Sequence, residues 1–114
     1  FVDMCVFKAE FGHFPDQHVR QIKLDGAGRR TGGGRIGGGV DLDVLDPSAF
    51  PGTGTPEAGG VTFNELMKAI KDVSQLNIVG FDMNELSPIY DHSGASTAMA
   101  CKLMREILLY FYKG

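Results

Sequence analysis

Beyond residue 40 the chain alternates between strand-like and helix-like patterns, and this alternation constrains the fold most strongly. A short strand is predicted within 41–46, because Pro47 cannot donate a hydrogen bond to a β-ladder. A helix is predicted over 62–74 and a buried strand over 77–83, and a last helix starts within 94–97 and reaches about residue 112. Strand, helix, strand and helix in succession indicate parallel βαβ units with right-handed crossovers. We therefore expect an α/β fold: a parallel sheet with flanking helices.

Both predicted helices have a recognisable apolar face. The first opens with Thr62 and Glu65 at the spacing of a capping box, in which the two residues satisfy free backbone donors reciprocally. Helical spacing then repeats along its predicted buried face: Phe63, Leu66, Met67, Ile70 and Val73. The last helix has a similar predicted face: Met99, Leu103, Met104, Ile107, Leu108 and Phe111.

The first forty residues are less regular. Residues 1–7 are apolar and favour a buried strand, 8–17 favour a loop, and 18–24 favour a second strand. Eight of the fourteen residues in 26–39 are glycine, so we predict a flexible connector there. A nucleotide-binding loop is a weaker alternative, because the spacing is not G-x-G-x-x-G and no helix-forming segment follows. Gly37–Gly39 should also weaken any strand that leads into Asp41.

Charge and cysteine content narrow the function classes. The net charge is −3, and residues 41–114 carry ten Asp/Glu against five Lys/Arg. This half fits metal cations and a cationic substrate and argues against nucleic acid, although an ordinary solvated surface is the alternative. The apolar run Ile107–Tyr112 is far too short to span a bilayer, so no membrane partner is expected. Cys5 and Cys101 lack metal-type spacing, which favours two reduced, buried thiols in a cytoplasmic protein over a disulfide.

Three aspartates lie close together before the Pro/Gly-rich turn. Asp41 and Asp43 are two residues apart, so on a strand both carboxylates would point to one face. Two hard oxygen ligands near a strand end suit Mn²⁺ or Mg²⁺, whereas a solvated pair is the alternative. Asp46 is expected to be structural, because its side chain can accept bonds from backbone amides in the turn that Pro47 opens.

Two stretches carry a family resemblance. DLDVLDP followed by PGTGTPEAGGVT, and VGFDMNELSPIYDHSGAST further on, resemble signatures of the ureohydrolase family (arginases, agmatinases and relatives), in its agmatinase-like branch. The similarity extends from Asp41 to about Tyr112, and a weaker one is present in HVRQIKL. It implies an arginase-type three-layer α/β fold, with residues 1–114 as a single partial domain. It further implies hydrolysis of an agmatine-like guanidino compound to urea and an amine, two Mn²⁺ ions, and a homo-oligomer.

The resemblance also implies roles for individual residues. Asp41 and Asp43 would bind Mn²⁺, and Glu85 would pair with the substrate guanidinium, for which a carboxylate is the matching bidentate acceptor. An exposed loop glutamate is the alternative for Glu85. His13 is the candidate catalytic residue for proton transfer, and a surface-loop histidine is an equal alternative.

Other polar residues of the second stretch are assigned structural roles. Asp82 lies within an apolar strand and needs a partner, so we expect it to support its neighbours. Asp91 and His92 are expected to shape their loop, because the family resemblance places no chemistry on them, although a histidine titrates in a range useful for catalysis.

Two family segments have no counterpart in this sequence: a GGDHS-like segment and an H-x-D-A-H-x-D-like segment. Two aspartates alone cannot hold two metal ions, because octahedral oxygen-rich sites need more protein ligands. The alternative function is therefore a non-catalytic, truncated or degenerate relative that acts as a scaffold or binding protein. A third hypothesis, prompted by a chain that begins at Phe1, is that segments of a larger active protein are missing.

Overall fold

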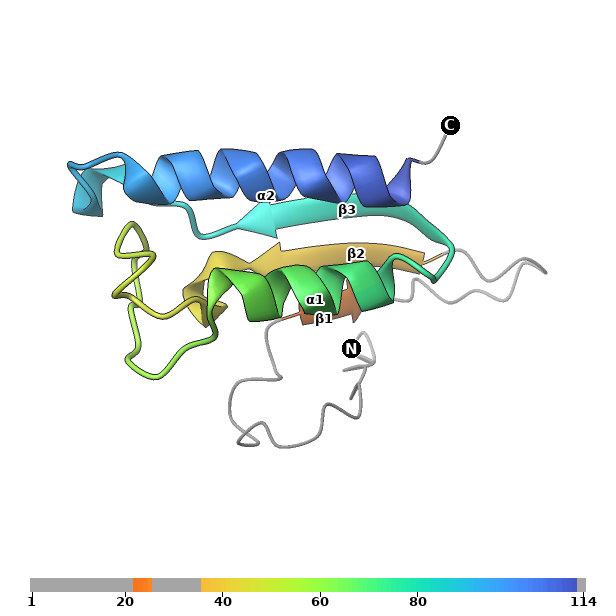
Figure 1. The fold of residues 1–114 in the computed structure, drawn as a ribbon, viewed down its shortest axis with the longest axis horizontal. Coiled ribbons are helices and arrows are strands. Elements are labelled where there is room, and N and C mark those ends of the chain that lie inside the picture. The colour runs from red at the N-terminus through yellow and green to blue at the C-terminus, as the bar shows by residue number, and fades with distance from the viewer. Residues whose placement is uncertain (1–21, 26–35, 113–114) are drawn as a thin grey trace.

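The computed structural model describes residues 22–25 and 36–112, which form three strands and two α-helices (Figure 1). The strands are β1 (Ile22–Asp25), β2 (Ile36–Asp41) and β3 (Ile78–Asn84), and the helices are α1 (Phe63–Val73) and α2 (Ala95–Phe111). Two short 3-10 helices, η2 (Leu42–Val44) and η3 (Pro88–Tyr90), follow β2 and β3 respectively. The predicted order of strand, helix, strand and helix agrees with β2, α1, β3 and α2, but the first strand ends at Asp41 rather than near Asp46, because Leu42–Val44 form η2.

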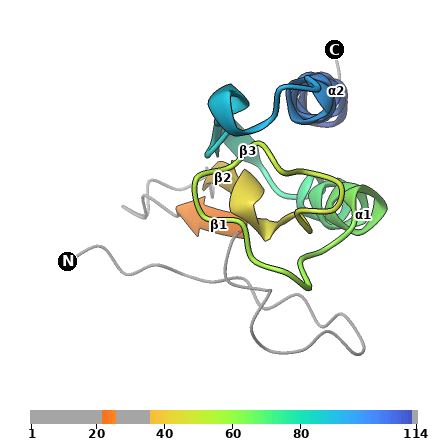
Figure 2. The ribbon, with the colours of Figure 1, turned by 90° about the vertical axis from the view of Figure 1, so that its left-hand side faces the viewer.

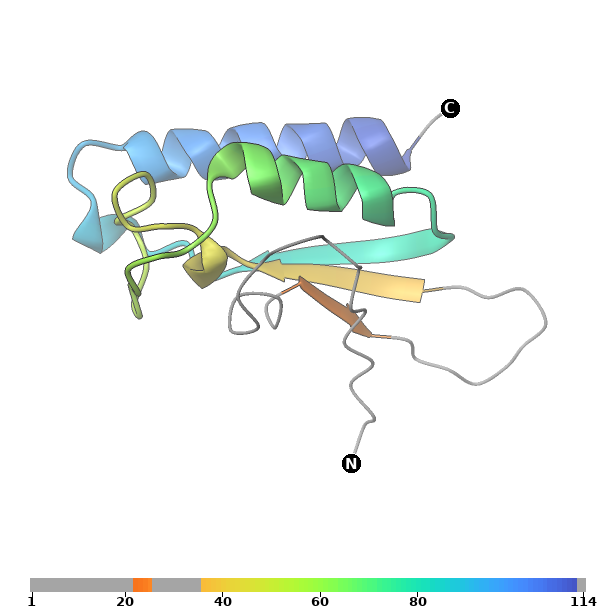
Figure 3. The same cartoon turned by 60° about the horizontal axis from the view of Figure 1, so that its bottom comes forward.

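The sheet has the order β1-β2-β3. β2 and β3 are parallel, with Val40 opposite Met83 and Asp41 opposite Asn84, and α1 forms the crossover between them. β1 runs antiparallel to β2, so the expectation of a parallel sheet holds for β2 and β3 but not for β1. Both helices lie on one face of the sheet (Figures 2 and 3), and within the described residues no helix covers the other face.

The glycines of β2 correct one prediction. Residues 36–39, the last four of the predicted connector, belong to the central strand, and residues 26–35 lie outside the described ones. The physical reason is pairing on both edges: the ladders to β1 and β3 offset the roughly 0.5–1 kcal/mol that each glycine costs in a strand. Gly39 is also suited to its place, because a Cβ there would lie 2.8 Å from Oδ1 of Asp82 on β3.

α1 begins and ends where its sequence predicts. The Thr62 side chain accepts a hydrogen bond from the Glu65 amide, and the Glu65 carboxylate accepts one from the Thr62 amide at 2.8 Å, which completes the capping box. This amide lowers the pKa of Glu65. The helix ends at Val73, one residue before the predicted end.

The core lies between the two helices and the covered face of the sheet. Its fully buried members come from β2, the turn after it and both helices: Val40, Leu42, Leu45, Phe50, Leu66, Ile70, Ala100, Leu103 and Ile107. Phe81 of β3 packs against Phe111 of α2 with ring centroids 5.2 Å apart. The core therefore packs the layer of two helices against the sheet. This packing positions the carboxyl ends of β2 and β3.

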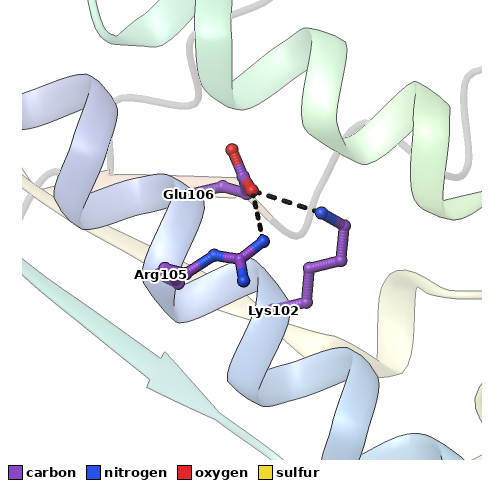
Figure 4. A network of polar contacts seen from close by, with 3 residues as sticks. All are labelled: Lys102, Arg105 and Glu106. Carbon is purple, nitrogen blue, oxygen red and sulfur yellow. Dashed lines mark hydrogen bonds and ion pairs between the residues drawn. The ribbon is translucent and has the colours of Figure 1, made fainter.

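The buried face of α2 is rotated from the predicted one. Ser96, Ala100, Leu103 and Ile107 form it, whereas Leu108 is 50% exposed. The prediction was right for Leu103 and Ile107 and wrong for Leu108, and Met99 and Phe111 are partly buried against the core. Elsewhere on α2 the partly buried Glu106 carboxylate lies 3.0 Å from Arg105 and 3.2 Å from Lys102 (Figure 4), and the Arg105 bond is the main cause of its lowered pKa.

Candidate metal and substrate site

The candidate site lies where β2 and β3 end. Asp41 is the last residue of β2 and is paired in register with Asn84, the last residue of β3, and Glu85 follows directly. Because parallel strands end at the same edge of a sheet, this register brings the predicted metal ligands and the predicted substrate residue to one edge. The sequence patterns predicted this edge correctly.

The sequence predicted that Asp41 and Asp43 share one face of a strand, but in the structure they do not. β2 ends at Asp41, and Leu42–Val44 turn into η2. The cause is a local cap: Oδ1 of Asp41 accepts a hydrogen bond from the amide of Asp43 at 3.1 Å, which stabilises the turn. Both aspartates are half-buried, and the turn places Leu42 and Val44 in the core.

The Asp43 carboxylate is held by two threonines of the loop that follows. The hydroxyl of Thr53 donates to one carboxylate oxygen of Asp43, and the hydroxyl of Thr55 donates to the other. Thr53 is buried and Thr55 is exposed. The PGTGTP stretch stands out in the sequence, but its pattern does not predict these two contacts. No local signal predicts them, because Thr53 and Thr55 lie 10 and 12 residues after Asp43.

Asp46 closes the same loop. Its carboxylate accepts bonds from the Ser48 hydroxyl and from the amides of Ser48 and Gly59, both amides at 2.9 Å. These bonds, the Ser48 hydroxyl first, lower the pKa of Asp46. The predicted structural role of Asp46 is confirmed. The loop then returns to the sheet through a bridge between Leu45 and Val61.

Glu85 has an unusual backbone. Its backbone φ is +68°, and among the described residues no other non-glycine residue has a positive φ. Its side chain is exposed. Non-glycine residues in this region cost about 1–3 kcal/mol and concentrate at functional sites. The conformation marks Glu85 as the second distinctive position of this edge.

The remaining predicted residues are placed as follows. Asp82 is exposed on β3 and accepts a hydrogen bond from the Asn84 side chain at 2.6 Å. Asp91 is buried, and hydroxyls and amides of Ser93 and Ser96 lower its pKa strongly, with the Ser93 hydroxyl first. His92 is exposed. His13 and Cys5 lie outside the described residues. Cys101 was predicted to be buried, but it is an exposed thiol, because it falls on the face of α2 that points away from the core residues Ala100 and Leu103.

The donor set for a metal is incomplete in the part of the chain that the structure describes. Asp41 and Asp43 offer hard oxygen ligands, but no three His, Cys, Asp or Glu side chains in that part are grouped closely enough to hold an ion. Octahedral oxygen-rich sites need further protein ligands. Two aspartates therefore fit a metal in donor chemistry but not in number.

In residues 22–25 and 36–112, no helix is long and apolar enough to cross a membrane.

Comparison with known proteins agrees with this geometry. The arginase family matches residues 7–110. The agmatinase of Bacillus subtilis (strain 168) is 46% identical over 76 residues, which cover 65% of this chain and 26% of that protein. The guanidinobutyrase of Pseudomonas aeruginosa is 39% identical over 79 residues, which cover 69% of this chain and 25% of that protein.

A solved structure shows the same likeness in three dimensions. The proclavaminate amidino hydrolase of Streptomyces clavuligerus superimposes with a TM-score of 0.61 and 42% identity, over 64% of this chain and 24% of that one. The fold is therefore a partial α/β fold of the arginase type. The match covers only 26% of the length of the B. subtilis relative. The chain belongs to the arginase family.

Proposed function

We propose that this chain is part of an agmatinase-like ureohydrolase, which hydrolyses a guanidino compound to urea and an amine. One observation carries the proposal: Asp41, Asp43 and Glu85 lie at the ends of two neighbouring parallel strands, where enzymes with such sheets bind their ligands. Relatives named agmatinase, guanidinobutyrase and proclavaminate amidinohydrolase match over this region, which supports a guanidino substrate.

The proposed metal is Mn²⁺, with Asp41 and Asp43 as oxygen ligands. The hydroxyls of Thr53 and Thr55 bind the Asp43 carboxylate, so its orientation is already restricted before any ion arrives. The described residues do not complete the donor set, so the proposal requires further ligands from outside the described residues.

For the substrate we propose an agmatine-like guanidino amine that pairs with Glu85. A guanidinium presents a planar fork of donors, and a carboxylate accepts two of them in parallel. Glu85 is exposed at the same edge as Asp41, which leaves its carboxylate accessible to such a ligand. The acidic charge of residues 41–114 would favour the approach of a cation.

A non-catalytic scaffold or binding protein is the second candidate function. It is favoured by the incomplete donor set of the described residues. Leu108, Leu109 and Tyr112 expose apolar surface on and after α2, which supports a homo-oligomer under either function. The proposed location is cytoplasmic, in line with the reduced thiols that the sequence predicts.

Urea release from agmatine tests the proposal. The Mn²⁺-loaded 114-residue chain should release urea, and Glu85→Gln should reduce kcat/KM by about two orders of magnitude, because a neutral amide loses the charged bidentate pair. Glu57→Gln is the matched control, since Glu57 is also exposed in a loop. If the folded chain releases no urea, catalysis by this chain is wrong and the scaffold function is favoured.

A further inference from the structure

We propose that Ser96 and Asp91 are positioning residues for the candidate metal ligand Asp43, although they lie about fifty residues further along the chain. The inference rests on the metal-binding role proposed above for Asp43. It concerns a series of hydrogen bonds that begins at the amino end of α2, passes through the backbone of Gly52, and ends at the Asp43 carboxylate.

The first step is the attachment of Gly52 to the segment that follows β3. The Gly52 amide donates to the Ser96 hydroxyl oxygen at 2.9 Å, and the Gly52 carbonyl accepts from the Ser87 amide at 2.7 Å. A Cβ on Gly52 would lie 2.6 Å from the Ser96 Cβ and 3.2 Å from the Asp91 Cβ. The loop backbone is therefore fixed on both its polar groups, at a distance that only glycine permits.

The second step is the anchoring of Ser96 itself. Oδ2 of Asp91 accepts a bond from the Ser96 amide at 2.7 Å, and Oδ1 accepts bonds from the Ser93 hydroxyl at 2.6 Å and the Ser93 amide at 3.0 Å. Asp91 is 7% exposed and Ser96 is fully buried. A buried carboxylate whose acceptor sites are occupied in this way is a fixed point, because loss of any partner would leave buried charge unsatisfied.

The third step links this fixed point to the candidate metal ligand. Thr53 follows Gly52 directly, is 2% exposed, and donates its hydroxyl to Asp43, while Thr55 donates to the other carboxylate oxygen. Each hydroxyl donates to one carboxylate oxygen of Asp43, so the two threonines determine which lone pairs of the carboxylate remain available to an ion. Partners that orient a ligand in this way typically change metal affinity by roughly 10–100-fold when they are removed.

Ser96→Ala tests the proposal with a metal-free and a metal-dependent measurement on the whole chain. Without metal, NMR should show faster exchange of the Gly52 amide and averaged χ1 couplings at Asp43 and Thr53. Calorimetric titration with Mn²⁺ should show affinity reduced about tenfold relative to the native chain. The matched control is Ser74→Ala at the end of α1, whose hydroxyl donates to the Lys71 carbonyl at 2.7 Å and which should change neither measurement.

The outcomes separate this proposal from the proposed function. A folded Ser96→Ala variant that keeps the native couplings and binds Mn²⁺ within twofold of native would overturn the positioning role. If the native chain binds no Mn²⁺, the metal function fails, and unchanged couplings in Ser96→Ala would then overturn the positioning role independently. Should Ser96→Ala not fold, Asp91→Asn is the milder variant, because an amide keeps one acceptor oxygen. It should shift the couplings in the same direction, and unchanged couplings would contradict the proposal.

Discussion

The ends of β2 and β3 lie side by side, yet they are built in opposite ways. After β2, the loop of residues 42–61 binds the side chains of two aspartates internally: Asp43 to two threonines and Asp46 to Ser48 and Gly59. After β3, Glu85 is exposed, carries a positive φ, and receives no hydrogen bond on its carboxylate within the described residues. The first end therefore holds its aspartates in place, and the second presents an exposed carboxylate.

The largest effect on stability is expected from a substitution in the loop that follows β2. Gly60→Ala would place a Cβ 2.5 Å from the Asp46 amide nitrogen and 2.6 Å from the Val44 carbonyl oxygen, both of them backbone atoms. We expect the free energy of unfolding to fall by about 3 kcal/mol, as overpacking against backbone does. Gly54→Ala is the control, because a Cβ there has no neighbour within 4 Å. Urea denaturation measures both, and equal stability of the two variants would contradict this description of the loop.

The next effect concerns the hydroxyls that hold Asp43. Thr53→Val keeps the shape of a buried side chain but removes its hydroxyl, which should cost about 2 kcal/mol because the bond is made to a carboxylate. Thr55→Val removes the exposed bond and should cost clearly less. Thermal unfolding of the pair measures the difference. If Thr55→Val destabilises the chain as much as Thr53→Val, burial does not strengthen this contact.

A third prediction uses the pH dependence of stability to test the buried carboxylate of Asp91. The folded-state pKa of Asp91 lies below its ordinary value, so its stabilising contribution is present above the unfolded pKa and is lost as pH falls through the folded pKa. Stability measured from pH 7 down to pH 2 should therefore decline less steeply in Asp91→Asn than in the native chain. A decline that is as steep in Asp91→Asn as in the native chain would show that the Asp91 carboxylate does not stabilise the fold in this way.

The smallest effect concerns the backbone at the free end. Glu85→Gly should raise the free energy of unfolding by about 0.5–1 kcal/mol, because glycine adopts a positive φ without the strain of a side chain. Glu57→Gly, in the exposed loop, should give no gain, since no positive φ is relieved there. Chemical denaturation distinguishes the two. A loss of stability in Glu85→Gly would mean that its side chain contributes more than its backbone costs.

Much of this architecture follows from sequence because local signals agree with the tertiary structure. The Thr62–Glu65 capping box begins α1 where it was predicted, and Ser87-Pro88 lies beyond the end of β3. The strand at 36–41 was missed because glycine composition favours a connector, while pairing with two neighbouring strands stabilises the extended backbone. The latter information is not local.

The candidate site was predicted in composition rather than in geometry. Asp41, Asp43 and Glu85 fall at one edge of the sheet as expected, but the turn at Leu42 separates the two aspartates from a common strand face. Thr53 and Ser96 could not be inferred, because their partners are distant in sequence and hydroxyl contacts leave no periodic pattern. His13 stays a prediction, since it lies outside the described residues.

The measurement that tests the central claim most directly is Mn²⁺ binding to the 114-residue chain, followed by electron paramagnetic resonance of the free ion. Asp41→Asn and Asp43→Asn are the test variants, and Asp72→Asn, an exposed carboxylate on α1, is the matched control. The account predicts that the native chain and the Asp72 variant bind Mn²⁺ and that both test variants lose it. Equal binding by all four proteins, or no binding by the folded native chain, would contradict the assignment of Asp41 and Asp43 as metal ligands.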